Sequence, residues 1–415
     1  MKKTVCWLLL SVLLTGCAGV SPSAEKTVET ADPLPQGEPA AQVAAIAGYD
    51  DFMAVLSAAV LDGQGNKNLS PVSVYLALAM TAEGARGQTQ AELLALLGEK
   101  NAEDMRKRAE EMLKSLSVSG ETSELILADS IWLGKQAGTG AFREEYLALL
   151  SDSYDAGADA VDFGTAEAGE RIAGWIREKT REKVKISDDD MAFDADTLAV
   201  LINTVYLKDG WRTPFDTNLT EKGTFSGPDG ERQVEYMART DNNGTIVRGE
   251  GYLRYAMALH ETGTMVFVLP DEGVALESLL DRPEGIRELL TGGAESSADV
   301  HILLPKFTFQ DRTDLEETLM EMGVRTCFSG AADFSAMTEV PAHVSRVLQE
   351  SFVGVDENGV TAAAYTLVAM TKGAAIPVER EKVDFHLTRP FLYAIESPDG
   401  IVLFIGTVTA PDQVQ

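Results

Sequence analysis

Histidine and cysteine, the side chains best suited to acid–base and covalent chemistry near neutral pH, are few in this chain of 415 residues. The histidines and cysteines are far apart in the sequence, at His260, His301, His343, His386, Cys6, Cys17 and Cys327. The chain has no Gly-x-Ser-x-Gly nucleophile elbow, no His-Glu-x-x-His pair and no Gly-rich phosphate-binding loop, and metal-ligand spacing is absent. We therefore expect no enzyme, no cofactor and no metal. A catalytic triad assembled from distant residues is the enzymatic alternative.

One cysteine has an expected reaction. Residues 1–17 follow the plan of a signal peptide, with two lysines and an apolar run that is too short to span a bilayer. Leu14-Thr15-Gly16-Cys17 resembles a lipobox, the site at which the cysteine thiol of a bacterial lipoprotein takes a diacylglycerol and becomes the new N-terminus. We expect Cys17 to be lipidated. The alternative is an ordinary signal peptide with an incidental cysteine.

Residues 18–44 are rich in Ala, Pro, Glu, Gly and Ser, which predicts a disordered tether before a folded domain over 45–415. A lipid anchor would hold the protein in the bacterial cell envelope, outside the cytoplasmic membrane, unless it is shed or secreted. Only Cys327 then remains, so no intrachain disulfide can form. Next to Phe328, Cys327 is expected to be a buried apolar residue.

Composition limits the classes of partner. The net charge of −30 argues against nucleic acid and anionic membrane surfaces, which are themselves negatively charged. The hydrophobic fraction of 45% permits a full core. The acidic surface is interpreted as a source of solubility, with attraction of basic proteases as the alternative.

The segment 356–377 is the most unusual part of the chain, because it has no charged residue from Val360 to Thr371. If it is extended, its alternating residues form two faces that are both small or apolar enough to be buried, as in a central strand. A helix is the alternative because the segment is rich in alanine, but its β-branched residues argue against it. We interpret the segment as a strand that can also be a loop.

Hydrophobic periodicity predicts the elements that position this segment. Helical patterns cover 45–116, 144–153, 166–182, 276–290 and 314–322. Strands are expected at 125–133, 197–207, 266–270, 300–304, 345–355, 385–395 and 401–408, and 241–244 has the composition of a hairpin turn. Helices first and strands later in one domain favour the α+β class.

Six blocks and the segment itself resemble the serpins, in the expected order, over about residues 45–411. The blocks are 68–73 with 76–89, 128–132, 203–211, 304–307, 389–391 and 403–408. The hinge of the family's reactive-centre loop is matched by Glu357, Gly359, Val360, Thr361, Ala362, Ala363 and Ala364. The resemblance implies an α+β serpin fold with helices packed on three β-sheets. It also implies an exposed loop that can insert as a central strand of the main sheet.

The resemblance further implies a serine protease inhibitor with a metastable fold. The target protease cleaves the loop and forms an acyl-enzyme, and the loop then inserts and traps the protease in a covalent complex. Gly359 permits a bend, the alanines meet little steric resistance, and neither a charge nor a proline interrupts 360–368.

This sequence departs from the family pattern at four positions. Val360 replaces the usual Thr or Ser, and Thr361 replaces Glu. Tyr365 is bulky for its place and could shift the protein toward substrate behaviour. Glu182 stands where many members have Gly.

The resemblance places the scissile bond at Gly373-Ala374, or one residue later at Ala374-Ala375. A small residue there predicts elastase-like or subtilisin-like targets. The alternative is cleavage after Lys372 by a trypsin-like protease. The expected partners are the protease and, through lipid alone, a membrane, and the protein is expected to be a monomer. The alternative from another class is a non-inhibitory binding module on the cell surface.

Overall fold

The computed structural model describes residues 46–118, 120, 123–135, 142–361 and 380–411, which belong to one compact unit. Its helices are α1 (Tyr49–Val60), α2 (Pro71–Gly84), α3 (Gly87–Leu97), α4 (Ala102–Ser115), α5 (Glu144–Tyr154), α6 (Ala166–Lys179), α7 (Glu277–Leu280), α8 (Pro283–Thr291) and α9 (Glu316–Glu321). Across these described ranges, none of the helices combines the length and the apolar character that a membrane crossing needs.

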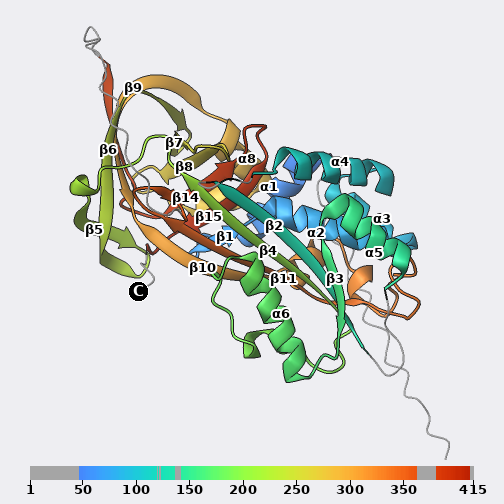
Figure 1. Cartoon of the computed structure of the whole chain (residues 1–415). Coiled ribbons are helices and arrows are strands. Elements are labelled where there is room, and N and C mark those ends of the chain that lie inside the picture. Colours follow the sequence, from blue (N-terminus) through green and yellow to red (C-terminus); the bar gives the residue numbers. More distant parts are fainter. Residues whose placement is uncertain (1–45, 119, 121–122, 136–141, 362–379, 412–415) are drawn as a thin grey trace, which may run out of the picture. The chain divides into compact units, whose positions relative to one another are not determined.

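The described strands are β1 (Lys67–Leu69), β2 (Glu124–Gly134), β3 (Gly157–Val161), β4 (Ala199–Gly210), β5 (Glu221–Gly227), β6 (Gly230–Gly249), β7 (Tyr252–Ala258), β8 (Thr264–Pro270), β9 (Ala294–Pro305), β10 (Phe307–Asp314), β11 (Val344–Val355), β12 (Gly359–Val360), β13 (Glu381–His386), β14 (Phe391–Glu396) and β15 (Val402–Val408). One sheet has the order β10-β11-β12-β4-β2-β3. The other has the order β1-β15-β14-β8-β7-β6-β9-β13, with β5 beside β6 (Figure 1). The mixture of helices with these sheets confirms the α+β class.

Two of the three expected sheets are hydrogen-bonded into one through β6. This strand is 20 residues long. Its first part pairs with β5, its last residues pair with β7, and β9 pairs along most of its length. A single long strand therefore belongs to what we expected to be separate sheets.

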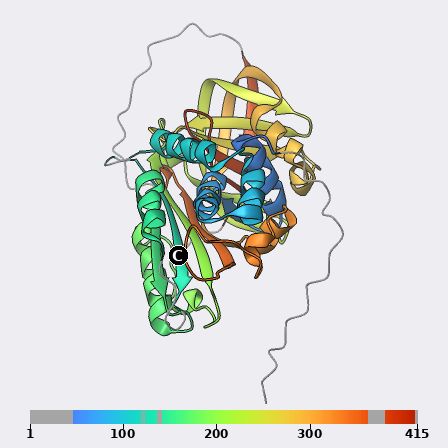
Figure 2. The same cartoon turned by 90° about the vertical axis from the view of Figure 1, so that its right-hand side faces the viewer.

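The sheet that contains β4 is buried on both faces. Leu201 and Val205 of β4 face one hydrophobic cluster, which includes residues of α2. Val200 and Ile202 face a second cluster, which includes residues of α6. Since side chains alternate along a strand, α2 and α6 lie on opposite faces of this sheet (Figures 1 and 2). Such double burial explains the nearly continuous apolar sequence of β4.

Several local expectations were wrong. The residues 241–244 do not form a hairpin but lie inside β6, where the pairing with β9 shifts between Asp241 and Gly244. Asn243 takes the left-handed φ of 63° in this bulge, a conformation that asparagine tolerates. The β9 partner continues on both sides of the bulge, so the chain does not turn back.

Prolines and polar breaks divide other expected elements. The helix expected at 276–290 is two helices, because Pro283 begins α8 after α7 has ended. The strand expected at 385–395 is β13 and β14, separated by a segment that contains Pro390. The helical region expected at 45–116 contains the short strand β1.

The structure gives a reason for the family's glycine at position 182. Arg181 and Glu182 follow α6 in the left-handed conformation, at φ 53° and 58°. Glycine adopts this conformation without steric penalty, whereas glutamate does not. Glu182 is therefore strained where many serpins are not.

Candidate functional site

Strand β12 lies between two longer strands at the start of the predicted hinge. Val360 pairs with Asp209 of β4 on one side and with Val355 of β11 on the other, antiparallel to both. The N–H of Thr361 donates to the carbonyl of Gly354 at 2.5 Å. A chain that continued in this direction would run between β4 and β11 as a new central strand.

Beyond β12, the two neighbours pair directly with each other. Residues 344–351 of β11 and 199–205 of β4 form a parallel ladder. We call this ladder the seam. β4 and β11 are each 12 residues long, so the seam occupies most of the path that a continued β12 would follow. The seam must separate before a strand can enter.

Gly359 makes the closest backbone approach of the hinge. A Cβ atom there would lie 2.1 Å from the carbonyl oxygen of Asp209 and 2.6 Å from the Cα of Gly210. Its φ of 156° is also rare for residues with a side chain. Only glycine fits where the chain enters the sheet.

A buried carboxylate anchors the chain just before the hinge. Glu357 is only 7% exposed, and its Oε1 accepts a hydrogen bond of 2.8 Å from the Thr220 hydroxyl. Its Oε2 lies 3.3 Å from the Nζ of Lys306. Burial works against the charged form, but the hydrogen bond from Thr220 and the nearby Lys306 hold the pKa of Glu357 below its usual range. Glu357 is therefore charged and fixed.

Backbone hydrogen bonds fix the same segment to the chain that follows β4. The N–H of Trp211 donates to the carbonyl of Asn358 at 2.8 Å, and its Nε1–H donates to the carbonyl of Asp356 at 2.9 Å. The N–H of Phe215 donates to the carbonyl of Glu357 at 2.9 Å. The hinge therefore begins at a rigid point.

A buried polar cluster lies under the seam, on the face toward α2. The side-chain amide of Asn203 on β4 donates to Asp129 Oδ1 of β2 at 2.5 Å and to the hydroxyl of Ser73 on α2. Gln349 on β11 donates to Asn203 Oδ1 at 2.6 Å and to the Ser70 carbonyl at 3.1 Å. These five residues, the seam cluster, join β2, β4, β11 and the start of α2. Separation of β4 from β11 must break the Asn203–Gln349 bond.

Asp129 is the only carboxyl group of the seam cluster. It is 5% exposed, and burial raises its pKa to about 7, although the hydrogen bond from Asn203 opposes this shift. At neutral pH the buried carboxyl is close to the point where it exchanges its proton. The seam cluster therefore contains a group whose charge changes near physiological pH.

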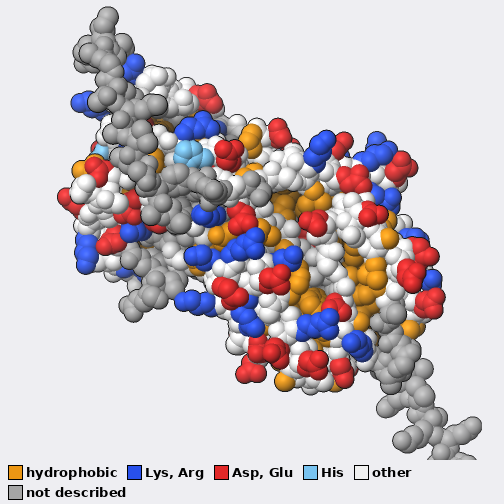
Figure 3. Space-filling model, viewed as in Figure 1, with side chains coloured by type: hydrophobic (Ala, Val, Ile, Leu, Met, Phe, Trp, Pro, Cys, Tyr) orange, Lys and Arg blue, Asp and Glu red, His pale blue; other side chains and the backbone are white. Residues whose placement is uncertain are grey.

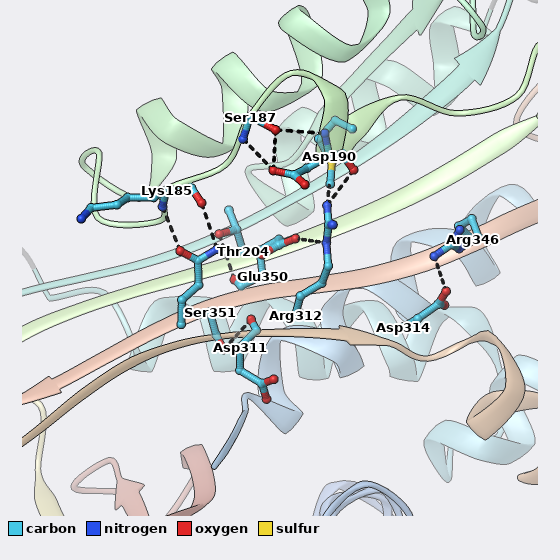
Figure 4. A network of polar contacts seen from close by, with 12 residues as sticks. Lys185, Ser187, Asp190, Thr204, Asp311, Arg312, Asp314, Arg346, Glu350 and Ser351 are labelled. Carbon is cyan, nitrogen blue, oxygen red and sulfur yellow. Dashed lines mark hydrogen bonds and ion pairs between the residues drawn. The ribbon is translucent and has the colours of Figure 1, made fainter. Parts of the chain in front are cut away.

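The opposite face of β11 carries a second polar network (Figure 4). Glu350 is 1% exposed, and its Oε1 lies 2.5 Å from the Nε of Arg312 on β10. Burial raises the pKa of Glu350, and Arg312 opposes the rise. Arg312 also donates to the carbonyl of Asp190 at 2.9 Å, and the Thr204 hydroxyl donates to the carbonyl of Glu350 at 3.1 Å. This network ties the segment after α6 to β10, β11 and β4.

Charged side chains of both signs are interspersed on the surface shown in Figure 3. The described residues on that face form no continuous basic area. A phosphate backbone needs such an area for non-specific binding.

The structure brings together the hinge residues that it describes, namely Glu357, Gly359, Val360 and Thr361. The other sequence-predicted residues lie outside the described ranges, and they are Cys17, Ala362, Ala363, Ala364, Lys372, Gly373, Ala374 and Ala375. Cys327 is buried as expected, and burial raises the pKa of its thiol.

Sequence reasoning missed the seam cluster. Asn203 interrupts the apolar run of β4, which is the signal that could have revealed it, whereas Gln349 lies in β11 among other polar residues and does not stand out. A buried side-chain amide needs hydrogen-bond partners, so its presence in a buried strand indicates a polar network. The partners themselves come from β2 and α2 and could not be paired from the sequence.

Comparisons with known proteins agree on one family. The sequence model of the family described as Serpin (serine protease inhibitor) matches residues 48–411. An uncharacterized serpin-like protein of Thermococcus kodakarensis is 31% identical, with 99% of each chain covered. The leukocyte elastase inhibitor of Sus scrofa is 27% identical over 84% of this chain and 93% of its own. The crystal structure of tengpin, a thermophilic serpin in its native state, superposes with a TM-score of 0.77 at 28% identity and covers 87% of this chain and 93% of its own.

Substitution of the entry glycine tests the geometry of the hinge. In Gly359→Ala the new methyl group collides with the Asp209 carbonyl, so residues 359–360 should leave their place between β4 and β11. We expect a loss of about 1–3 kcal/mol, typical of overpacking, which thermal unfolding would measure as a lower melting temperature. The matched control is Gly330→Ala, where a Cβ has no neighbour within 4 Å. Equal melting temperatures for both variants would contradict this account.

Replacement of the seam carboxyl tests the buried titration. The pKa of Asp129 is about 7 in the folded state and about 4 in the unfolded chain. The unfolded state therefore loses its proton first, and stability is lost as pH rises from about 4 through 7, on the order of 4 kcal/mol at most.

Asp129→Asn is neutral at every pH and should be spared this loss. We expect its melting temperature to exceed that of the parent by much more at pH 8 than at pH 5. Asp399→Asn, which replaces an exposed carboxyl in the turn before β15, is the control and should show no such divergence. A difference independent of pH for Asp129→Asn would show that the carboxyl does not titrate as described.

Proposed function

This chain belongs to the serpin family, and on that premise we propose that it inhibits serine proteases by suicide-substrate trapping. Serpins are generally protease inhibitors. In the proposed mechanism, the protease serine attacks the carbonyl carbon of the residue before the scissile bond. The peptide bond breaks, the new amino terminus leaves, and an acyl-enzyme remains on the loop. Insertion of the loop then displaces the protease before water can release it.

One observation carries this proposal: β12 already occupies the first two positions of a strand between β4 and β11. The residues that follow have the composition that the path requires. Residues 360–371 carry no charge and no proline, and they are as many as the residues of β4. A charge would be costly to bury there, and a proline could not donate to a central ladder.

Hydrogen bonding favours insertion. The seam is one parallel ladder. A strand inserted in the direction of β12 would replace it with two antiparallel ladders, which are slightly more stable per residue. The net gain is one ladder, on the order of 10 kcal/mol at about 1 kcal/mol for each hydrogen bond, before the entropy of ordering the loop is subtracted. The uncleaved loop cannot realise this gain while both its ends are held.

The described part of the chain holds the loop at both ends. Before it, the hydrogen bonds of Glu357 and the Trp211 contacts fix the hinge. After it, β13 begins at Glu381 and pairs with β9 in the other sheet. Cleavage frees the hinge side from this tether.

We propose that the bond is Gly373-Ala374 or Ala374-Ala375 and that the targets are elastase-like or subtilisin-like. The leukocyte elastase inhibitor among the relatives is consistent with this class. Lys372 would direct the inhibitor to trypsin-like proteases if the bond followed it. We further propose that Cys17 carries a lipid, and that the monomeric domain is held by residues 18–44 outside the cytoplasmic membrane.

Covalent trapping is tested by mixing the protein with pancreatic elastase, subtilisin and trypsin and running denaturing gels. We expect a band at the summed mass with elastase or subtilisin, and a new N-terminus at Ala374 or Ala375. A complex with trypsin and cleavage after Lys372 would overturn the proposed specificity. Cleavage by all three enzymes without any such band would overturn inhibition and favour the non-inhibitory binding module.

The insertion path is tested by a charge at its entrance. Val360 is 1% exposed between β4 and β11, so Val360→Arg would put an unpaired charge in the buried position that β12 already occupies and from which insertion must continue. We expect the variant to be cleaved at the same bond but to form no covalent complex, measured on the same gels. The matched control is Val378→Arg, which places the same charge after the proposed bond and should leave trapping intact. If Val360→Arg traps the protease as efficiently as the parent, the insertion mechanism is wrong.

A further inference from the structure

Three side chains with metal-binding atoms meet on the outer face of the second sheet. His301 lies on β9, and Asp384 and His386 lie on β13. The two strands are parallel, with Asp384 directly opposite His301. Because alternate residues of a strand share a face, Asp384 and His386 point to the same side as each other. The inward positions between and beside them are apolar, as shown by Val383 and Phe385, which are buried.

We propose that His301, Asp384 and His386 bind a divalent transition-metal ion of the Zn²⁺ type and thereby clamp strand β13 to β9. Asp384 and His386 are two residues apart on β13, whereas His301 lies more than 80 residues before them, so the full set could not be recognised from sequence spacing. The proposal is independent of protease inhibition, since it concerns the other sheet.

The distances between the ligand atoms suit one ion. Nε2 of His386 lies 2.9 Å from Nδ1 of His301, and Oδ1 of Asp384 lies 3.5 Å and 3.8 Å from these two atoms. Donor atoms on a tetrahedral zinc ion, at about 2.0–2.2 Å from it, lie roughly 3.3–3.6 Å from one another. The observed triangle brackets this edge length, so small rotations of the side chains would complete one face of a tetrahedron.

The donor types determine the class of metal. Two imidazole nitrogens and one carboxylate oxygen suit Zn²⁺ and its first-row neighbours, whereas Mg²⁺ and Ca²⁺ prefer oxygen alone. The side chains are 47%, 75% and 34% exposed for His301, Asp384 and His386. An ion held there would keep an open position for water or for a ligand from another molecule.

The neighbouring carboxylate of Asp299 already has other partners. Asp299 lies two residues before His301 on β9, but its carboxylate already accepts from the N–H of Asn243 at 3.1 Å and lies 3.8 Å from Arg380. Without metal, the short contact between the two histidines is a hydrogen bond from one ring to the other. The carboxylate is too far from either ring nitrogen for a hydrogen bond. A cation between the three would use all of them at once.

The position of β13 gives the site a consequence. β13 is the last strand of its sheet and has β9 as its neighbour there. It also begins directly after the predicted reactive loop, at Glu381. A metal ion bound by ligands on both strands would add a cross-link to this edge, because binding energy that requires the folded site also stabilises it. The ion would therefore resist detachment of β13.

The test is calorimetric titration of the full chain with zinc chloride, after chelator treatment and without a histidine tag. We expect one ion for each chain, and no comparable binding of magnesium chloride. His301→Gln and His386→Gln should each weaken zinc binding at least about tenfold, since each removes a ligand from a site of three. His343→Gln removes a histidine elsewhere and should bind zinc like the parent. The variants are otherwise identical to the parent, so zinc bound elsewhere on the chain would not distinguish them.

Zinc affinity that is unchanged in both His301→Gln and His386→Gln would overturn the site, as would the absence of binding to the parent. Thermal unfolding separates the second claim from the first. We expect zinc to raise the melting temperature of the parent and of His343→Gln but not that of the two ligand variants. Zinc binding without such a rise in the parent would overturn the clamp on β13.

Discussion

The structure depends on the pairing of β4 with β11, which is direct along only part of the two strands. β4 and β11 pair directly along the seam and part at one end, where Gly359 and Val360 stand between them. The parallel pair of β4 and β11 therefore lies next to the first two residues of an antiparallel arrangement, which has slightly more stable hydrogen bonding per residue. The contacts around the hinge fix the start of that arrangement. Gly359 lets the chain approach the Asp209 carbonyl, and Glu357 holds the preceding turn.

Both faces of the seam are closed by different kinds of contact. Toward α2, the seam cluster joins three strands and a helix through the amides of Asn203 and Gln349. Toward α6, apolar packing is supplemented by the buried Glu350 and its partner Arg312. Opening the seam must break directed hydrogen bonds on one face and separate packed side chains on the other. Directed bonds have sharp geometric limits, so such a seam is either closed or open, which suits a switch between two states.

The second sheet bears on the same loop from its other end. In the sequence, the predicted reactive loop lies between the hinge and β13. The pairing of β13 with β9 therefore concerns one end of this loop, and the closed seam concerns the other end. His301, Asp384 and His386 lie at the edge formed by β9 and β13, where we propose a metal site. Asp129 lies beneath the seam, and its raised pKa makes its charge depend on pH near neutrality. The proposed metal site and the titration of Asp129 would therefore subject the two ends of the loop to different chemical conditions, metal ions at one end and protons at the other.

The sequence by itself determined the α+β class, most strands and helices and the family, and it predicted the hinge residues. These follow from local properties: the nearly continuous apolar run of β4, helix formers in α5 and α6, and a stretch without charge after Gly359. Only the tertiary structure decided the bulge at Asn243, the joining of two sheets through β6, the seam cluster and the meeting of His301, Asp384 and His386. Each of these depends on which strands become neighbours. Asp129 and Gln349, and likewise His301 and His386, are separated by long stretches of chain. Periodicity in a single sequence indicates the face on which a residue lies but not the residues that it contacts there.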